Sequence, residues 1–197
     1  ARRLIKQFTP DMVFGVGGYV TGPVMLAARL SGIPLCIHEQ NSVPGLANKM
    51  LLRVVNKIFL SIPCQYSFPS RKTVMAGNPV RREILEAAAL KEKAGNRKKT
   101  TLLVLGGSQG AHRVNSLVTE AVEMLVKTYG ITLSVIHQTG KVDEEKVRSH
   151  YDQFELQAEV KAFFQDMAEL YSRADLVISR AGATTLAELS VDRKSVV

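Results

Sequence analysis

Residues 106–110 follow an unbroken apolar run and precede an amphipathic stretch, an order that predicts a buried strand, a tight turn and the start of a helix. Glycines let backbone N–H groups lie against a ligand, and the amino end of a helix attracts negative charge. Ser108 adds a hydroxyl donor where a phosphate oxygen would lie. A plain strand-to-helix turn is the alternative. The residues of this predicted diphosphate site are Gly106, Gly107, Ser108, Gln109 and Gly110.

Spacing excludes two familiar phosphate-binding patterns. The dinucleotide fingerprint G-x-G-x-x-G requires glycine where Ser108 stands. The P-loop requires Gly-Lys followed by Ser or Thr, and the chain contains no such tripeptide.

A second glycine-rich segment follows the apolar residues 12–16. Gly17, Gly18 and Tyr19 come shortly before Gly22 and Pro23, and proline is well tolerated in the first turn of a helix. This order predicts a second anion site at a helix start. A simple Gly-Pro turn is the alternative.

Consecutive polar side chains follow the apolar residues 35–37. They include His38, Glu39 and Asn41, and such groups are costly at the end of a buried strand unless they find partners. His38 and Glu39 could act as a general base and its orienting carboxylate, although strand alternation directs neighbours to opposite faces. The alternative is a helix cap, with His38 satisfied in the core.

Two further segments carry polar groups at strand ends. Arg81, after Gly77-Asn78-Pro79, offers a guanidinium fork for a diphosphate. In residues 179–188, small residues and a threonine at the helix N-cap permit close approach of a ligand, and Glu188 can accept ribose hydroxyls. Alternatively, Thr184 and Glu188 only cap the helix and favour its dipole.

The elements that must position these groups alternate along the chain. This alternation predicts an α/β fold with parallel sheets covered on both faces, and ligand groups at the carboxyl ends of the strands. A basic stretch after residue 89 predicts a joint between two sheets. Expected strands are 12–16, 35–38, 57–60, 73–76, 102–105, 132–137, 160–163 and 176–179, and expected helices are 24–31, 46–54, 82–89, 111–128, 144–154, 167–174 and 185–189.

Composition narrows the function classes. The 197 residues are 46% hydrophobic and carry a net charge of +8, which favours a polyanionic partner, although a solvated basic loop at 91–99 also explains part of it. Aromatic residues are sparse, which argues against a stacking surface for single-stranded nucleic acid. Apolar runs fall far short of the roughly 20 residues that span a bilayer. Cys36 and Cys64 lack metal-ligand spacing, so free thiols are expected.

Five segments together resemble the MurG glycosyltransferases of bacterial cell-wall synthesis over roughly residues 1–190. They are residues 15–19 (GVGGY), 38–41 (HEQN), 77–81 (GNPVR), 106–110 (GGSQG) and 179–182 (SRAG). The resemblance implies a GT-B architecture of two Rossmann-like, doubly wound parallel-sheet domains, both incomplete here. It also implies inverting transfer of N-acetylglucosamine from UDP-GlcNAc to the muramyl C4 hydroxyl of lipid I, which makes lipid II at the cytoplasmic membrane face.

The resemblance also assigns roles. Gly17, Gly18 and Tyr19 correspond to an acceptor-diphosphate loop, and Phe164 to a position whose backbone meets uracil. His38, Glu39 and Asn115 match polar positions of less certain role; the first two are the catalytic candidates, and Asn115 supports the glycine-rich loop. The donor-binding candidates are Asn41, Arg81, Ser108, Phe164, Ala183, Thr184, Thr185, Leu186, Ala187 and Glu188.

The expected partners are UDP-GlcNAc, lipid I and the anionic cytoplasmic membrane surface, without nucleic acid. No Asp-x-Asp occurs, in agreement with a transferase that needs no metal or other cofactor. The basic opening (Arg2, Arg3 and Lys6 beside apolar residues) is either a membrane-facing helix or an amphipathic helix packed on the sheet.

The expected organisation is an acceptor-side domain at 1–80, a linker with a first helix at 81–99, a UDP-GlcNAc domain at 100–190 and a truncated or non-native tail at 191–197. The family's first glycine-rich loop and its C-terminal segment are missing from the chain. We therefore expect an internal fragment that is inactive alone. The competing interpretations are a UDP-GlcNAc 2-epimerase of the same fold and a non-catalytic nucleotide-sugar-binding or nucleic-acid-binding module.

Overall fold

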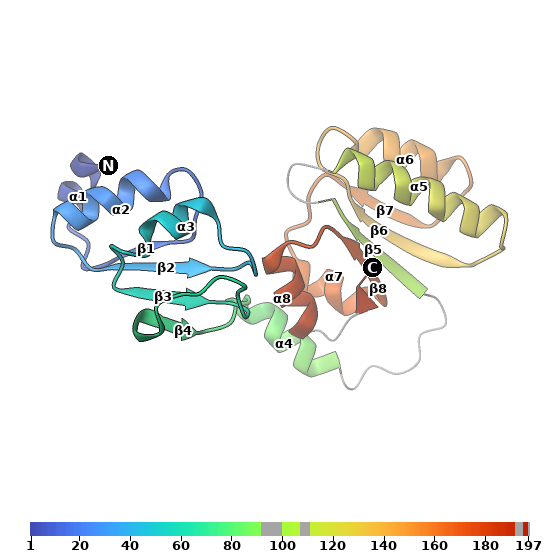
Figure 1. Cartoon of the computed structure of the whole chain (residues 1–197). Helices are drawn as coiled ribbons and strands as arrows, with labels where there is room; N and C mark the ends of the chain where they lie inside the picture. Colours follow the sequence, from blue (N-terminus) through green and yellow to red (C-terminus); the bar gives the residue numbers. More distant parts are fainter. Residues whose placement is uncertain (92–99, 107–110, 192–194, 197) are drawn as a thin grey trace. The chain divides into compact units, whose positions relative to one another are not determined.

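The computed structural model describes residues 1–91, 100–106, 111–191 and 195–196 (Figure 1). The chain divides into two compact units, Ala1–Pro79 and Val80–Val197. Each unit contains its own sheet, and each is described separately below. Ser108 and the other residues of 107–110 lie outside the described residues.

The first unit is built on a four-stranded parallel sheet in the order β1-β2-β3-β4. Helices α1, α2 and α3 supply the apolar side chains that pack with β2 and β3 into one core (Figure 1). A short 3-10 turn, Ser70–Lys72, leads into β4. The bounds are α1 Arg2–Phe8, β1 Val13–Gly15, α2 Thr21–Leu30, β2 Leu35–Glu39, α3 Leu46–Leu51, β3 Lys57–Leu60 and β4 Thr73–Met75.

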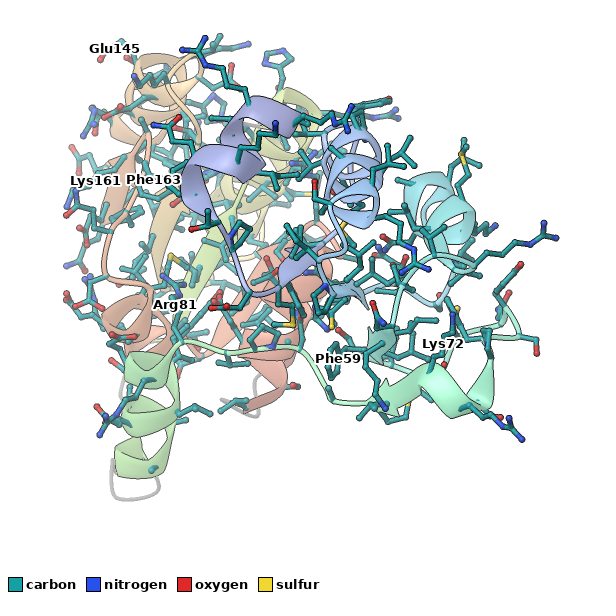
Figure 2. All side chains as sticks on the ribbon, turned by 90° about the vertical axis from the view of Figure 1, so that its left-hand side faces the viewer. Phe59, Lys72, Arg81, Glu145, Lys161 and Phe163 are labelled. Atoms are coloured by element: carbon teal, nitrogen blue, oxygen red, sulfur yellow. The ribbon has the colours of Figure 1, made fainter. Side chains whose placement is uncertain are left out.

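The opposite face of the first sheet carries aromatic rings. Phe14 is 49% exposed, and its ring lies 5.9 Å from that of Phe59, which is labelled in Figure 2. The His38 ring lies 6.3 Å from Phe14. In this unit the described helices therefore pack on one face, whereas the sequence pattern predicted cover on both.

The second unit is built on a five-stranded parallel sheet in the order β7-β6-β5-β8-β9. Figure 1 shows α5 and α6 on one face of this sheet and α4, α7 and α8 on the other. The bounds are α4 Arg82–Lys91, β5 Thr100–Leu105, α5 His112–Lys127, β6 Leu133–Gln138, α6 Glu144–Asp152, β7 Ala158–Lys161, α7 Met167–Arg173, β8 Leu176–Ser179, α8 Ala183–Val191 and β9 Ser195–Val196.

Side-chain alternation along β5 builds the core on both faces of the second sheet. Leu103 packs with α7 and α8 residues, whereas its neighbour Val104 packs with residues of α5 and α6. Both side chains are fully buried. The predicted α/β fold with parallel sheets is confirmed.

The structure differs from the sequence prediction at several boundaries. Strand β7 begins at Ala158 and ends at Lys161, two residues earlier than expected. Thr184 is not an N-cap, because α8 already begins at Ala183 and Thr184 lies inside its first turn. Helix α4 belongs to the second unit, where Ile84 is buried in the core. Within the expected tail at 191–197, Ser195 pairs with Leu176 as part of the short strand β9.

The N-terminal residues Arg2–Phe8 form helix α1, which packs against α2. Ile5 is buried in the core, while Leu4 and Phe8 are exposed. Within the described residues, no helix has the length and hydropathy that crossing a bilayer requires.

Gly106 marks the point where β5 leaves the sheet. A Cβ atom at this position would lie 2.9 Å from Asn115 Oδ1 and 2.9 Å from the Gln138 carbonyl oxygen. Both contacts are shorter than those that real Cβ atoms make. The Gln138 carbonyl belongs to the backbone of β6, so it cannot rotate away as a flexible side chain could. Glycine is therefore required here by close approach of the chain to β6.

We predict that Gly106→Ala lowers the free energy of unfolding of the second unit by about 1–3 kcal/mol, because the added methyl group must displace β6 or Asn115. Urea denaturation measures the change. Gly22→Ala is the control, since its Cβ would enter open space within α2 and should leave stability equal or slightly higher. Equal stabilities for Gly106→Ala and the parent chain would contradict the packing described here.

Candidate functional site

A buried carboxylate links three helices of the second unit. Glu188 on α8 has a side chain only 7% exposed, and its Oε1 accepts hydrogen bonds from Arg81 Nη2 at 3.0 Å and Arg81 Nε at 3.1 Å. Tyr171 on α7 donates its hydroxyl to Glu188 Oε2 at 2.9 Å. A buried carboxylate is tolerated only when donors of this kind compensate its lost hydration. We call Arg81, Tyr171 and Glu188 the Glu188 cluster.

The guanidinium of Arg81 uses only one of its edges in this cluster. Nε and one Nη2 N–H face the carboxylate. The other edge, formed by Nη1 and the second Nη2 N–H, makes no hydrogen bond to the described residues. Because the Arg81 side chain is 49% exposed, that edge can receive a planar anion from solvent.

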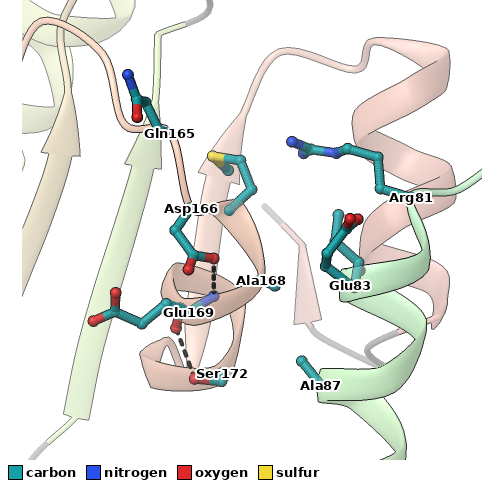
Figure 3. A pocket seen from close by; sticks show the side chains of 10 residues that line it. Arg81, Glu83, Ala87, Gln165, Asp166, Ala168, Glu169 and Ser172 are labelled. Carbon is teal, nitrogen blue, oxygen red and sulfur yellow. Dashed lines mark hydrogen bonds between the residues drawn. The ribbon is translucent and has the colours of Figure 1, made fainter.

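A cavity of about 630 Å³ opens beside Arg81 between α4 and the start of α7. Figure 3 shows Arg81 extending from the start of α4 toward the loop that carries Gln165 and Asp166. Asp166 caps α7, because its Oδ1 accepts a hydrogen bond from the Glu169 backbone N–H at 2.9 Å. Its carboxylate therefore already stabilises the start of the helix. Among the predicted donor-binding residues that the structure describes, Arg81 alone lines this cavity.

Phe164 immediately precedes the cavity loop. Its side chain is buried, and its backbone N–H donates to Gln138 Oε1 at 3.1 Å. The Lys161 ammonium lies 5.0 Å from the Phe164 ring centre. The Phe164 backbone N–H is therefore already used in a hydrogen bond to Gln138. The Phe164 carbonyl oxygen is the backbone group that a nucleobase can contact.

Asn115 on α5 holds the end of the glycine-rich segment in place. It is buried, and its Nδ2 donates to the Thr139 carbonyl at 2.9 Å and to Asp143 Oδ2 at 2.7 Å. Asn115 Oδ1 lies 3.1 Å from His137 Nε2. These bonds attach the start of α5 to the loop after β6. On the other side of residues 107–110, the Gly106 backbone N–H donates to the Gln138 carbonyl at 2.9 Å and holds the end of β5 against β6.

The hydrogen bonds also define the protonation of His137. Because Asn115 uses its amide N–H groups as donors elsewhere, its Oδ1 must accept, and His137 Nε2 must carry the proton. His137 Nδ1 then accepts from the Tyr151 hydroxyl at 3.0 Å. Burial lowers the pKa of His137 to about 4, outweighing the opposing field of Asp143, and burial raises the pKa of Tyr151. The pair is neutral near pH 7.

Asp143 forms the charged end of this network. It accepts from His112 Nδ1 at 2.8 Å, and this bond is the main cause that lowers the pKa of Asp143. His112 is the first residue of α5 and its side chain is 71% exposed. The carboxylate thus ties the exposed beginning of α5 to the buried Asn115.

In the first unit, Gly17 and Gly18 have positive φ angles of +93° and +84°. Residues other than glycine rarely adopt backbone conformations with such positive φ angles, so both positions require glycine. Thr21 Oγ1 donates to the Gly17 carbonyl at the start of α2, and buried Asn48 lies beside Gly17. Tyr19 is fully exposed.

The structure does not bring His38 and Glu39 together, so the proposed pairing of a base with its orienting carboxylate is wrong. Alternation along β2 sends the two side chains to opposite faces of the sheet. His38 Nε2 lies 2.9 Å from Ser61 Oγ and 3.2 Å from the Gly77 carbonyl.

Glu39 instead organises the loop that follows β2. It accepts the backbone N–H groups of Asn41 and Gly45, each at 3.0 Å, and Asn48 Nδ2 at 2.8 Å. Burial raises the pKa of Glu39, but these hydrogen bonds outweigh it and lower the pKa overall. The Asn41 amide also donates to Glu39, at 3.2 Å.

The remaining donor candidates lie at the start of α8. Thr184 and Leu186 are exposed, while Ala183, Thr185 and Ala187 are half-buried. Ser179, which ends β8 just before this loop, has a buried hydroxyl that finds no hydrogen-bond partner among the described residues. Asn41 belongs to the first unit, whereas the other described donor candidates belong to the second.

Sequence reasoning missed Tyr171 and Gln138, and also His137 and Asp143, which both bond to Asn115. The polar run His137, Gln138, Thr139 at the end of a buried strand is the same signal that marked His38 to Asn41. It could therefore have been found. Tyr171 had no such signal, because it lies at a core position of an ordinary helix.

Two family models match the chain. The glycosyltransferase family 28 N-terminal domain matches residues 1–60, and the family 28 C-terminal domain matches residues 101–197. The chain belongs to glycosyltransferase family 28.

Curated relatives of this family 28 chain carry one name, UDP-N-acetylglucosamine–N-acetylmuramyl-(pentapeptide) pyrophosphoryl-undecaprenol N-acetylglucosamine transferase. The protein of Geotalea uraniireducens is 46% identical over 99% of this chain and 54% of its own length. That of Geobacter sulfurreducens is 47% identical over 96% of this chain and 52% of its own length. The chain therefore spans about half the length of the curated relatives it matches.

Solved structures agree with the family assignment. Acinetobacter baumannii MurG is 36% identical, with a TM-score of 0.73 over 97% of this chain and 52% of that chain. The UDP-GlcNAc 2-epimerase of Neisseria meningitidis, solved with UDP-GlcNAc, is 16% identical, with a TM-score of 0.67 over 100% of this chain and 61% of that chain. At that identity the epimerase shows a shared fold alone. The predicted resemblance to the MurG group and its GT-B fold is confirmed.

The lowered pKa of His137 predicts a pH dependence of stability. In the unfolded chain this histidine takes up a proton near pH 6.5, but in the folded chain only near pH 4. The unfolded state therefore binds more protons in this window, and stability falls as pH decreases through it, by on the order of 3 kcal/mol. Urea denaturation between pH 7 and 4 measures the slope. His137→Gln should flatten it, and an unchanged slope in that variant would refute the assignment.

Proposed function

We propose that the chain is part of an inverting glycosyltransferase that moves N-acetylglucosamine from UDP-GlcNAc to the muramyl C4 hydroxyl of lipid I, forming lipid II. The names of the curated relatives and the similarity to MurG support this activity. The structural observation that carries it is the Glu188 cluster, a buried carboxylate and an open guanidinium edge beside a cavity.

The second unit would bind the donor. Glu188 would accept ribose hydroxyls, and the outer edge of Arg81 would face a phosphate oxygen. The Phe164 carbonyl would meet the uracil N–H, and the start of α8, from Ala183 to Ala187, would line the nucleotide. Residues 106–110, including Ser108, would contact the diphosphate at the amino end of α5. Asn115 holds this end of the helix against the loop after β6.

Transfer leaves negative charge on the departing UDP. Backbone N–H groups, the amino end of a helix and a guanidinium aimed at this charge stabilise the transition state by electrostatic preorganisation. This mechanism requires no cofactor. Within the described residues, no group of three or more His, Cys, Asp or Glu side chains is arranged to hold a metal ion.

The first unit would bind the acceptor. The left-handed Gly17 and Gly18 would present backbone groups to the lipid diphosphate, and Tyr19 is exposed beside them. Glu39 would act by holding the loop of Asn41 and Gly45 against Asn48 of α3 rather than by proton transfer, since its oxygens already accept hydrogen bonds from these residues. His38 remains the candidate for contact with the acceptor hydroxyl.

We further propose peripheral association with the anionic cytoplasmic face of the bacterial membrane. Helix α1 presents Arg2, Arg3 and Lys6 together with exposed Leu4 and Phe8. Basic and apolar side chains on one short helix suit a surface of anionic lipid headgroups.

A radiolabel assay tests the proposal. A full-length enzyme containing this sequence should transfer label from UDP-GlcNAc to a lipid I analogue, while the 197-residue chain alone should make no lipid II. In the full-length enzyme, Glu188→Ala should lower kcat/KM by about 10- to 100-fold, mainly through KM, because a charge-assisted hydrogen bond to the donor is lost.

Glu123→Gln is the matched control. It changes a carboxylate on α5 that pairs only with Lys127 and His150 at the surface, and it should leave kcat/KM unchanged. Release of free sugar or of an epimer without transfer would contradict the transferase assignment and favour the epimerase.

A further inference from the structure

The hydroxyl of Tyr171 lies in an apolar core where few polar groups are found. The side chain is 2% exposed and packs among Leu103, Ile136, Leu170 and Leu189. Its ring alone would satisfy that packing, so phenylalanine would fill the same space. The hydroxyl instead reaches α8 and donates to Glu188 Oε2 at 2.9 Å.

The two donors of the cluster hold the carboxylate differently. Arg81 is half-exposed and bonds only to Oε1, so solvent or a ligand can replace it. Tyr171 is buried, and its hydroxyl donates to the other carboxylate oxygen, Oε2. A carboxylate offers about four acceptor positions, and these three hydrogen bonds leave one of them open on Oε2. The fixed phenol therefore decides which way that open lone pair points.

We propose that Tyr171 is a positioning residue that sets the orientation of the Glu188 carboxylate toward the ribose of the nucleotide. This inference rests on the proposed function, in which Glu188 accepts ribose hydroxyls. Tyr171 does not touch the nucleotide and acts only through Glu188. Without its hydroxyl, the carboxylate turns toward Arg81, and its discrimination between ribose and deoxyribose weakens.

Calorimetric titration of the 197-residue chain with UDP, 2′-deoxy-UDP and 3′-deoxy-UDP tests the inference. The parent chain should bind at least one deoxy analogue about 10-fold more weakly than UDP, as expected for loss of a hydrogen bond to a charged group. Tyr171→Phe should reduce this ratio of affinities to less than about 3-fold, because it weakens the binding of UDP and leaves the binding of the deoxy analogue nearly unchanged.

Thr119→Val is the matched control. It removes another buried hydroxyl, on α5, where it serves only the helix backbone. Even if Thr119→Val loses as much stability as Tyr171→Phe, it should discriminate between ribose and deoxyribose as well as the parent chain does. In a Glu188→Gln background, Tyr171→Phe should change the ratio no further, because the residue acts through Glu188.

The outcomes are distinguishable. Full discrimination retained in Tyr171→Phe overturns the inference and leaves the proposed function intact. UDP binding by the parent chain without discrimination against either analogue overturns the role of Glu188 and therefore that of Tyr171. Absence of UDP binding contradicts the donor site itself.

Discussion

A carboxylate inside an apolar core must be surrounded by donors, and the second unit is arranged around one such group. The Glu188 carboxylate, on α8, accepts hydrogen bonds from Arg81 at the start of α4 and from Tyr171 on α7. Arg81 and Glu188 are 107 residues apart in the sequence. Their ion pair fixes α4 and α8 relative to each other, and thereby one wall of the cavity beside α7.

The same rule operates at the other strand ends. Glu39 accepts hydrogen bonds from the loop after β2, and Asn115 joins the start of α5 to the loop after β6. Apolar strands supply the core, so polar groups accumulate where the strands end and must find partners among themselves. The candidate ligand groups in each unit are therefore held by hydrogen bonds that exist before any ligand arrives.

Much of this architecture follows from sequence alone. Apolar runs alternating with amphipathic stretches predict the parallel strands and the glycine-rich turn at Gly106. The contacts with β6 and Asn115 that require glycine there are seen only in the structure. The alternation of side chains along a strand also predicts that His38 and Glu39 point to opposite faces of the sheet. Long-range pairings are different, because no local pattern predicts that Arg81 meets Glu188 or that Gln138 occupies the Phe164 amide. Tyr171 has the pattern of an ordinary core residue, and only the position of its hydroxyl shows otherwise.

We infer that the unit Val80–Val197 contains most of the site for the uridine diphosphate group. Titration of the ¹⁵N-labelled chain with UDP, followed by amide NMR, tests this most directly. We expect saturable shifts at the amides around Phe164, Gly182 to Glu188 and Asn115, while the amides of Ala1–Pro79 other than those around Asn41 stay unchanged. Shifts confined to Ala1–Pro79, or an unaltered spectrum at millimolar UDP, would contradict it.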